Sequence, residues 1–275
     1  MDKKLKRKLI ILASLVVYYL VFSYIPWERN IGQRGFLIAR LIAFAPALGL
    51  LIFFKHYWHF EIDRPHLELR YSFLLPLLVF INLNFLAALI FGYSWSKEAS
   101  DVPLLILELF SDCAAAVFED LLFVDLFICV LLDCMHFKHA KLLSIFLSAT
   151  LFTLAHAYTF LYPGDFSNPM AVALLQEIFV FLLTLVCGYL AIYFDSALIP
   201  VAFHFLYNAV NHILFYHYCA FEISWPYVLF VSTVALLGIF YFTSLWQMSE
   251  HQAFRKNKKP EGSLEKKDGG DYSAV

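Results

Sequence analysis

Long apolar runs divide this chain and constrain its fold more than any other feature. An α-helix needs about 20 apolar residues to cross a bilayer, and runs of about that length fall near 9–26, 36–54, 72–93, 103–131, 141–161, 170–194, 196–218 and 226–246. Backbone groups inside a bilayer must be paired within their own segment, so each run is expected to be a helix. The sequence therefore predicts an all-α, polytopic membrane protein with about eight transmembrane helices.

The composition agrees with this prediction. Hydrophobic residues make up 61% of the 275 residues and charged residues only 15%, whereas a soluble domain is about half apolar and about a quarter charged. The 30 Phe and 16 Tyr suit lipid contact and the aromatic belts at membrane interfaces. An ordinary soluble enzyme and a nucleic-acid partner are not expected.

Basic residues predict the orientation and the division of the chain. The first residues, "MDKKLKRK", are basic, and alternation along about eight spans puts most later clusters on the same side, including Lys55, Lys138 and Arg255. Positive charge marks the cytoplasmic side, so both termini are expected in the cytoplasm, most naturally of a bacterial inner membrane. We divide the chain into about three amino-terminal spans (1–100), a core (101–218), a last span (219–246) and a disordered cytoplasmic tail (247–275).

Carboxylates interrupt the fourth run, which contains "VFEDLLFVD" at 117–125. An Asp near the middle of a spanning helix costs on the order of 2.5 to 3.5 kcal/mol, so such a residue suggests a functional site. At about 100° per residue, Glu108, Asp112 and Glu119 share one face, whereas Asp120 and Asp125 point elsewhere. For Glu108, Asp112 and Asp125 we favour the structural alternative, a protonated acid bonded to a neighbouring helix.

Two histidines lie in later runs. His156 is in "LFTLAHAY", four residues after Phe152, and His204 is in "VAFHFLYNAVNH", four residues before Asn208. Residues four apart share a helix face. A lone buried histidine is more often structural than catalytic. Together, however, a Glu, two His and an Asn on three spans supply a base, two polarising groups and an amide donor for an oxyanion.

The order of these motifs resembles the CPBP family, also called Abi or CAAX-protease-like, which includes CAAX prenyl endopeptidases and bacteriocin-processing proteases. The family pattern is Glu-Glu-x-x-x-Arg, then Phe-x-x-x-His, then His-x-x-x-Asn or Asp. The resemblance covers roughly 103–212 and implies an intramembrane endopeptidase with its catalytic core in the later helices. It implies that Glu119 activates water, that His156 and His204 assist, and that Asn208 helps to hold the oxyanion, with Phe152 as a supporting residue.

Two positions depart from the family pattern. Asp120 replaces the second Glu, which shortens the side chain by one methylene, and Val124 replaces the Arg. Any ion pair that this arginine makes must be missing or supplied from elsewhere. Asp120 is therefore expected to be a supporting residue that is protonated or has found another donor.

The resemblance leaves the metal question open. We expect no cofactor, because catalytic zinc sites commonly use three strong ligands such as two His and one Glu, but a divalent metal such as zinc is not excluded. Its ligands would then be Glu119, His156 and His204. The expected partners are the bilayer and a membrane-associated protein or peptide, processed at a tail, a leader or a sorting signal.

Two other functions compete with the endopeptidase. A catalytically weak or inactive CPBP-like scaffold or immunity protein would keep the fold and tolerate the changes at Asp120 and Val124. A proton-coupled transporter would also use buried acids and histidines, but the chain lacks the paired repeats with broken helices that such transporters commonly show.

Overall fold

The computed structural model shows a bundle of helices. It describes residues 3–25, 27–57, 79–80, 82–91, 94–95, 102–137, 139–161, 169–194, 196–212, 219–220 and 224–257. Within these ranges the only strands are β1 (Ser94–Trp95) and β2 (Cys219–Ala220), which form one short antiparallel pair. The prediction of an all-α fold class is confirmed in this coarse sense.

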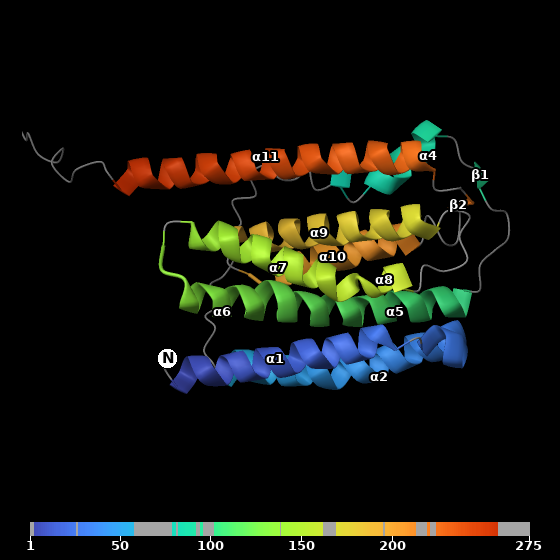
Figure 1. Ribbon diagram of the computed structural model, residues 1–275, viewed down its shortest axis with the longest axis horizontal. Coiled ribbons are helices and arrows are strands. Elements are labelled where there is room, and N and C mark those ends of the chain that lie inside the picture. The colour runs from blue at the N-terminus through green and yellow to red at the C-terminus, as the bar shows by residue number, and fades with distance from the viewer. Residues whose placement is uncertain are drawn as a thin grey trace, which may run out of the picture.

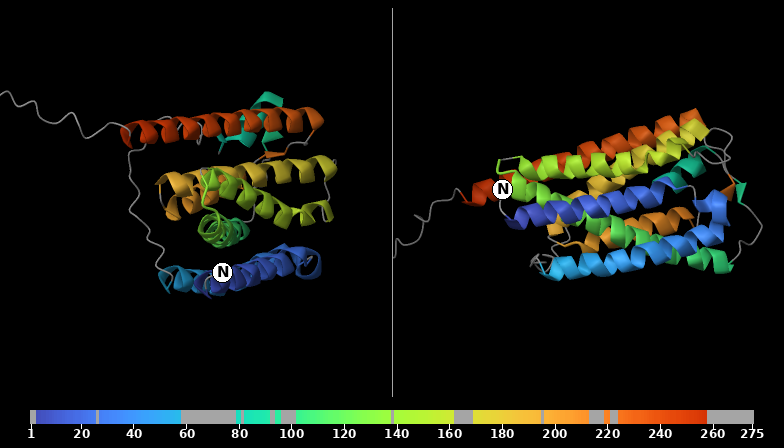
Figure 2. Two further views of the ribbon diagram at one scale, coloured as in Figure 1. Left: turned by 60° about the vertical axis from the view of Figure 1, so that its left-hand side comes forward. Right: turned by 60° about the horizontal axis from the view of Figure 1, so that its bottom comes forward.

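The helices run side by side along the long axis of the molecule (Figure 1). They are α1 (Lys3–Tyr24), α2 (Trp27–Tyr57), α4 (Leu83–Phe91), α5 (Val102–Glu119), the π-helical η1 (Asp120–Leu126), α6 (Phe127–Cys134), α7 (Ala140–His156), α8 (Tyr158–Leu161), α9 (Pro169–Phe194), α10 (Leu198–Asn211) and α11 (Trp225–Asn257). α1 and α2 form one outer layer, and α11 lies with α4 on the opposite side (Figures 1 and 2). The rod made by α5, η1 and α6 lies between α1 and the central helices.

Prolines mark where several helices begin. Pro103, Pro169, Pro200 and Pro226 all lie in the first turn of their helices, where the missing N–H removes no helical hydrogen bond. At the start of α10, the Leu198 N–H donates to the Ser196 hydroxyl at 3.2 Å, which satisfies one of the free donors of that turn. The helix starts are thus set by local chemistry.

Several boundaries differ from those predicted. α2 begins at Trp27 and is broken at Gly32, whose φ of 73° lies in the region that glycine adopts without strain. α10 has 14 residues, fewer than a straight span needs, and residues 213–218 of the predicted span lie outside the described residues. α11 continues to Asn257, whereas a disordered tail was expected from residue 247. The helix extends into polar residues beyond the end of the apolar run.

One helix in the described part of the chain, Pro169–Ile192 in α9, is long and apolar enough to cross a membrane by length and composition. The helix is largely buried, and a core helix of a soluble protein has the same properties, so α9 alone does not establish a membrane span. The eight-span membrane protein is accordingly part of the proposal below. The start of α1 and the end of α11 lie at the same end of the bundle (Figure 1). This arrangement is consistent with the prediction that both termini lie on one side of a membrane.

Close packing in the centre positions the later helices. A Cβ added at Gly188 of α9 would lie 2.8 Å from Ile145 Cγ2 of α7, so glycine allows these two helices to approach closely. A second apolar cluster contains the aromatic rings of Tyr19, Phe118 and Phe123. It joins α1 to the rod of α5 and η1, and it surrounds the polar groups described next.

Candidate active site

Glu119 and Asp120 lie where the α-helix α5 changes into the π-helix η1. π-helical turns are rare and occur frequently at functional sites. Inside this widened segment, the Phe123 carbonyl accepts a hydrogen bond from the Ser148 hydroxyl of α7 at 2.5 Å. The bond ties α7 to the turn that presents both carboxylates.

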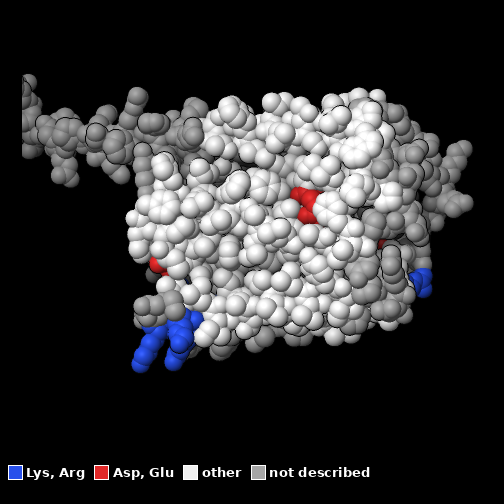
Figure 3. Space-filling model, in the orientation of Figure 1, with Lys and Arg blue, Asp and Glu red and all other residues white. Residues whose placement is uncertain are grey.

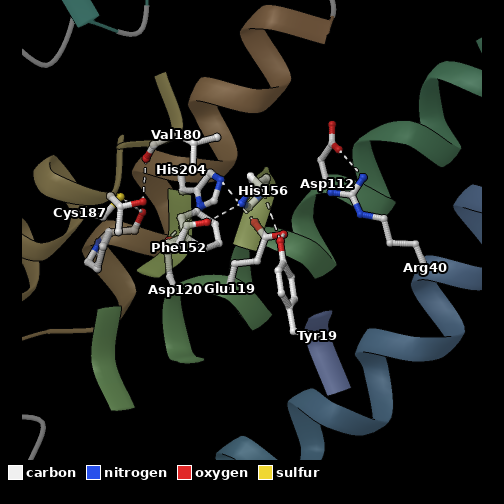
Figure 4. A network of polar contacts seen from close by, with 12 residues as sticks. Tyr19, Arg40, Asp112, Glu119, Asp120, Phe152, His156, Val180, Cys187 and His204 are labelled. Atoms are coloured by element: carbon white, nitrogen blue, oxygen red, sulfur yellow. Dashed lines mark hydrogen bonds and ion pairs between the residues drawn. The ribbon is translucent and has the colours of Figure 1, made fainter. Parts of the chain in front are cut away.

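Tyr19 of α1 joins Glu119 to His156. Its hydroxyl donates to Glu119 Oε1 at 2.9 Å and lies 3.2 Å from His156 Nε2. Glu119 and His156 are only 7% and 8% exposed. The sequence places these residues on different helices, and the structure brings them together around one phenolic oxygen (Figure 4).

His204 of α10 lies between two carboxylates. Its Nδ1 is 3.2 Å from Asp120 Oδ1, and its Nε2 is 3.8 Å from Glu119 Oε2. Glu119 and Asp120 approach His204 from different sides, and the imidazole is wide enough to meet one carboxylate at each ring nitrogen. The contact with His204 agrees with the prediction that Asp120 is a supporting residue, which stays a prediction.

His156 is held by the backbone of its own helix. Its Nδ1 is 3.0 Å from the Phe152 carbonyl oxygen, and because a carbonyl only accepts, Nδ1 carries a hydrogen. The Phe152 ring packs edge-on against His156 with a centroid distance of 4.4 Å. Phe152 thus fixes both the orientation and the tautomer of the imidazole.

Asn208 lies one turn after His204 on α10 and is half-buried. Its amide forms no hydrogen bond with any described residue. The structure therefore brings Glu119, His156 and His204 together, whereas Asn208 is tied to them by no hydrogen bond among the described residues.

The other acids of α5 bond to neighbouring helices. Gln33 Nε2 of α2 donates to Glu108 Oε1 at 2.6 Å, and Arg40 of α2 is 3.3 Å from Asp112 Oδ1. The His212 Nδ1 atom contacts the other Asp112 oxygen. The predicted bonds to a neighbouring helix are thus present for Glu108 and Asp112. The partner of Asp112 is a cation, Arg40, whereas the sequence analysis favoured a neutral acid at this position.

Val124 shows what has replaced the missing family arginine. Its side chain is 1% exposed and belongs to an apolar cluster with Ile128 and Ile145. Asp120 Oδ2 is buried and accepts no hydrogen bond from the described residues. No cation stands at this position, and His204 Nδ1 lies 3.2 Å from the other oxygen of Asp120.

Glu119, His156 and His204 are the side chains that the sequence offers as ligands if a metal is bound. In the described part of the chain, no three His, Cys, Asp or Glu side chains come together in a group that could hold a metal ion. The Tyr19 hydroxyl joins Glu119 to His156, and His204 faces one carboxylate with each ring nitrogen. Glu119, His156 and His204 are therefore not arranged as the ligands of one metal ion.

Tyr19 and Arg40 are functional candidates that the sequence reasoning missed. Both lie within predicted spans, Tyr19 in "VVYYL" and Arg40 in "LIARLIAF". A polar group inside an apolar span requires a partner. That signal was available, but the partner of each side chain lies on a helix far along the chain and only packing reveals it.

Residues 101–210 match a family model whose description is "Type II CAAX prenyl endopeptidase Rce1-like". The match covers 110 of the 275 residues and confirms the resemblance to the CPBP family that the motifs indicate. The matched family is one of CAAX-type proteases. No curated protein and no solved structure matches the chain.

The CPBP segment contains Glu119, His156, His204 and Asn208. Tyr19 lies about 80 residues before its start, and Arg40 also precedes it. The amino-terminal helices therefore contribute side chains to a cluster that otherwise comes from the family segment. The site combines parts of the chain that the family pattern covers with parts that it does not.

Proposed function

We propose that this protein is an intramembrane endopeptidase that hydrolyses a peptide bond of a membrane-associated substrate with water activated by Glu119. The observation that carries the proposal is the convergence of Glu119, His156 and His204 from three helices into one buried cluster. The Tyr19 hydroxyl links Glu119 to His156, and His204 Nε2 lies 3.8 Å from Glu119. A carboxylate and two imidazoles are groups that general acid–base catalysis uses.

The reaction needs no covalent enzyme intermediate. Glu119 accepts one proton of a water molecule while the water oxygen bonds to the substrate carbonyl carbon, forming a tetrahedral intermediate. His204 and Asn208 donate to the oxyanion. A proton then passes to the leaving nitrogen, the C–N bond breaks, and a carboxylic acid and an amine are released. Burial strengthens each of these electrostatic contacts relative to water.

Outward-facing apolar side chains support a membrane location. Ile42 of α2 is 68% exposed and Phe240 of α11 is 75% exposed, and large exposed apolar surfaces mark contact with lipid or partners. Figure 3 shows one face that is almost free of charge apart from a small acidic patch, with Lys and Arg at its ends. We propose a multi-pass protein of about eight spans with both termini cytoplasmic, in a bacterial inner membrane.

The proposed substrate is a membrane-associated protein or peptide that is cut at a tail, leader or sorting signal. The family is named for CAAX prenyl endopeptidases, which supports a substrate held at the bilayer. Bilayer lipid is the second partner. The proposal includes no metal step, because the acid–base groups of the cluster suffice for water attack.

Glu119→Gln tests the proposal. Gln keeps the size and the hydrogen-bonding ability of the side chain and removes the base, so cleavage should fall by about 10²- to 10⁴-fold. Membranes containing wild type or variant at equal protein levels are compared by proteomics of peptide termini. Glu108→Gln is the matched control, since Glu108 is a buried glutamate of the same helix bonded to Gln33.

The expected result is a defined set of precursors that accumulate with Glu119→Gln and not with Glu108→Gln. These precursors would also identify the substrate. Identical peptide termini in wild type and Glu119→Gln membranes would end the endopeptidase proposal.

The second candidate is the non-catalytic scaffold. The observation that favours it is the buried Asp120 oxygen without a hydrogen bond from described residues, beside the apolar Val124. If the protein is a scaffold, Glu119→Gln cells keep the wild-type phenotype and cells that lack the protein lose it. If it is an endopeptidase, both strains lose the phenotype, so comparing the two strains separates the candidates.

A further inference from the structure

Tyr19 occupies a central position in the cluster without belonging to the family segment. Its side chain is 2% exposed, and its ring packs against Phe44 and Phe118, with centroid distances of 6.2 and 6.1 Å. Phe123 packs edge-on against it at 5.3 Å. The ring is therefore held in place, and the hydroxyl has a fixed position between Glu119 and His156.

The hydrogen atoms around this hydroxyl can be counted. His156 has a hydrogen on Nδ1, which it donates to the Phe152 carbonyl, so a neutral His156 presents a lone pair at Nε2. The ionised Glu119 carboxylate also only accepts. The single Tyr19 hydrogen thus faces two acceptors, at 2.9 and 3.2 Å, and can satisfy only one of them.

One additional proton would complete both contacts. If Glu119 is protonated, its hydroxyl can donate to the Tyr19 oxygen while the Tyr19 hydrogen is donated to His156 Nε2. The proton that Glu119 takes from the attacking water is such a proton. The proton that Glu119 takes from water can therefore be passed on through hydrogen bonds that are already in place.

We propose that Tyr19 is a proton relay that passes the proton of the attacking water from Glu119 to His156. This inference rests on the proposed function. It makes the first helix of the chain part of the reaction machinery, with Tyr19 as a positioning residue that acts through Glu119 and His156.

The relay step balances. Water gives one proton to Glu119 and its oxygen bonds to the carbonyl carbon. Glu119 passes that proton to the Tyr19 oxygen as the Tyr19 hydrogen moves to His156 Nε2, which leaves Glu119 ionised, Tyr19 neutral and His156 positively charged. His156 then gives its Nε2 proton to the leaving nitrogen, the C–N bond breaks, and all three side chains return to their starting states.

Other charged groups lie around the relay. His204 is 3.8 Å from the far oxygen of Glu119, and Asp120 lies beyond it. Arg40 of α2 pairs with Asp112 on the side of Glu119 away from His204 (Figure 4). An imidazolium at His156 would be balanced by the ionised Glu119 carboxylate that the relay leaves behind.

Tyr19→Phe tests the relay, because it removes one oxygen and keeps the ring that packs in the aromatic cage. Tyr18→Phe is the matched control, since the Tyr18 hydroxyl donates to the Ala43 carbonyl on the exposed side of the same helix. The full-length protein is assayed in membranes, with a precursor that accumulates in Glu119→Gln membranes as the probe. kcat, KM and the dependence of the rate on the fraction of D2O are measured.

The relay predicts that Tyr19→Phe lowers kcat by at least about tenfold with little change in KM, while Tyr18→Phe has the wild-type rate. It also predicts a curved dependence of the rate on D2O in wild type, because several protons move together, and a linear one in Tyr19→Phe. A wild-type rate in Tyr19→Phe would overturn the relay, as would a faster rate, which would mean that the hydroxyl blocks the site of the water.

The relay and the endopeptidase fail in different ways. Full activity of Tyr19→Phe with no activity of Glu119→Gln ends the relay and leaves the endopeptidase intact. If Glu119→Gln changes no peptide terminus, the endopeptidase itself is wrong and the relay falls with it. A substrate-free check is the ¹⁵N spectrum of histidine-labelled protein, where the His156 Nε2 resonance must move in Tyr19→Phe and not in Tyr18→Phe.

Discussion

Two Asp–His pairs join the same two helices, and only one of them belongs to the candidate active site. Asp112 contacts His212, and Asp120 contacts His204. The pairs are eight residues apart on both helices, as expected where an antiparallel helix crosses the rod of α5 and η1. The residue types and the supporting helices are shared, so any difference in chemistry comes from the third partner.

The third partner differs in sign. Arg40 pairs with Asp112, and the His212 side chain is 29% exposed. At the other pair, Glu119 faces His204, whose side chain is 5% exposed. An arginine neutralises a carboxylate and stabilises the fold, whereas a second carboxylate beside a buried imidazole provides a base. The comparison teaches that an acid and a histidine on facing helices are not by themselves a site.

The largest expected effect separates the two histidines. His204→Gln should lower cleavage of the precursor by about 10²- to 10⁴-fold, because the side chain that contacts both Glu119 and Asp120 loses its imidazole. His212→Gln should lower it by less than about tenfold, which is about 1.4 kcal/mol. The measurement is the initial rate in membranes with equal amounts of protein. Equal losses in the two variants would mean that both pairs serve one site and would break the comparison.

The second effect is on stability and concerns Arg40. Arg40→Met leaves the Asp112 carboxylate, whose side chain is 2% exposed, without its cation. Breaking a buried ion pair costs about 3 to 5 kcal/mol, and the partial exposure of Arg40 favours the lower end. The free energy of unfolding in mixed micelles is the readout.

The double variant Arg40→Met with Asp112→Leu provides the control for that prediction. Removing both charges takes away the unpaired anion, so much of the lost stability should return. If the double variant is no more stable than Arg40→Met alone, Arg40 stabilises the bundle by packing and not by its charge on Asp112.

The smallest effect concerns the close approach of α7 and α9, which helps to position His156. Gly188→Ala places a Cβ where Ile145 Cγ2 would be only 2.8 Å away, so we expect the free energy of unfolding to fall by about 1 to 3 kcal/mol. In an Ile145→Ala background, which lacks both γ-carbons, Gly188→Ala should cost less than it does in the wild type. Unchanged stability in Gly188→Ala would show that the helices separate easily at this point.

Much of the fold and part of the site could be predicted because they depend on local patterns. Each helix that the structure describes overlaps one of the apolar runs, and the motif spacing identified Glu119, His156 and His204, which the structure brings together. Helix ends were harder, as Asn211 and Asn257 show, because an apolar run and a helix stop for different reasons.

The sequence by itself determined the helical character, the acid and histidines of the motifs, and the family resemblance of residues 101–210. Only the tertiary structure decided that Tyr19 bridges Glu119 and His156 and that Arg40 pairs with Asp112. Helix formation and motif spacing are short-range properties of the chain, whereas the contact of Tyr19 with Glu119 spans 100 residues. Such contacts arise only when α1 and α2 pack against the rod of α5 and η1, and periodicity within one helix does not specify its neighbour.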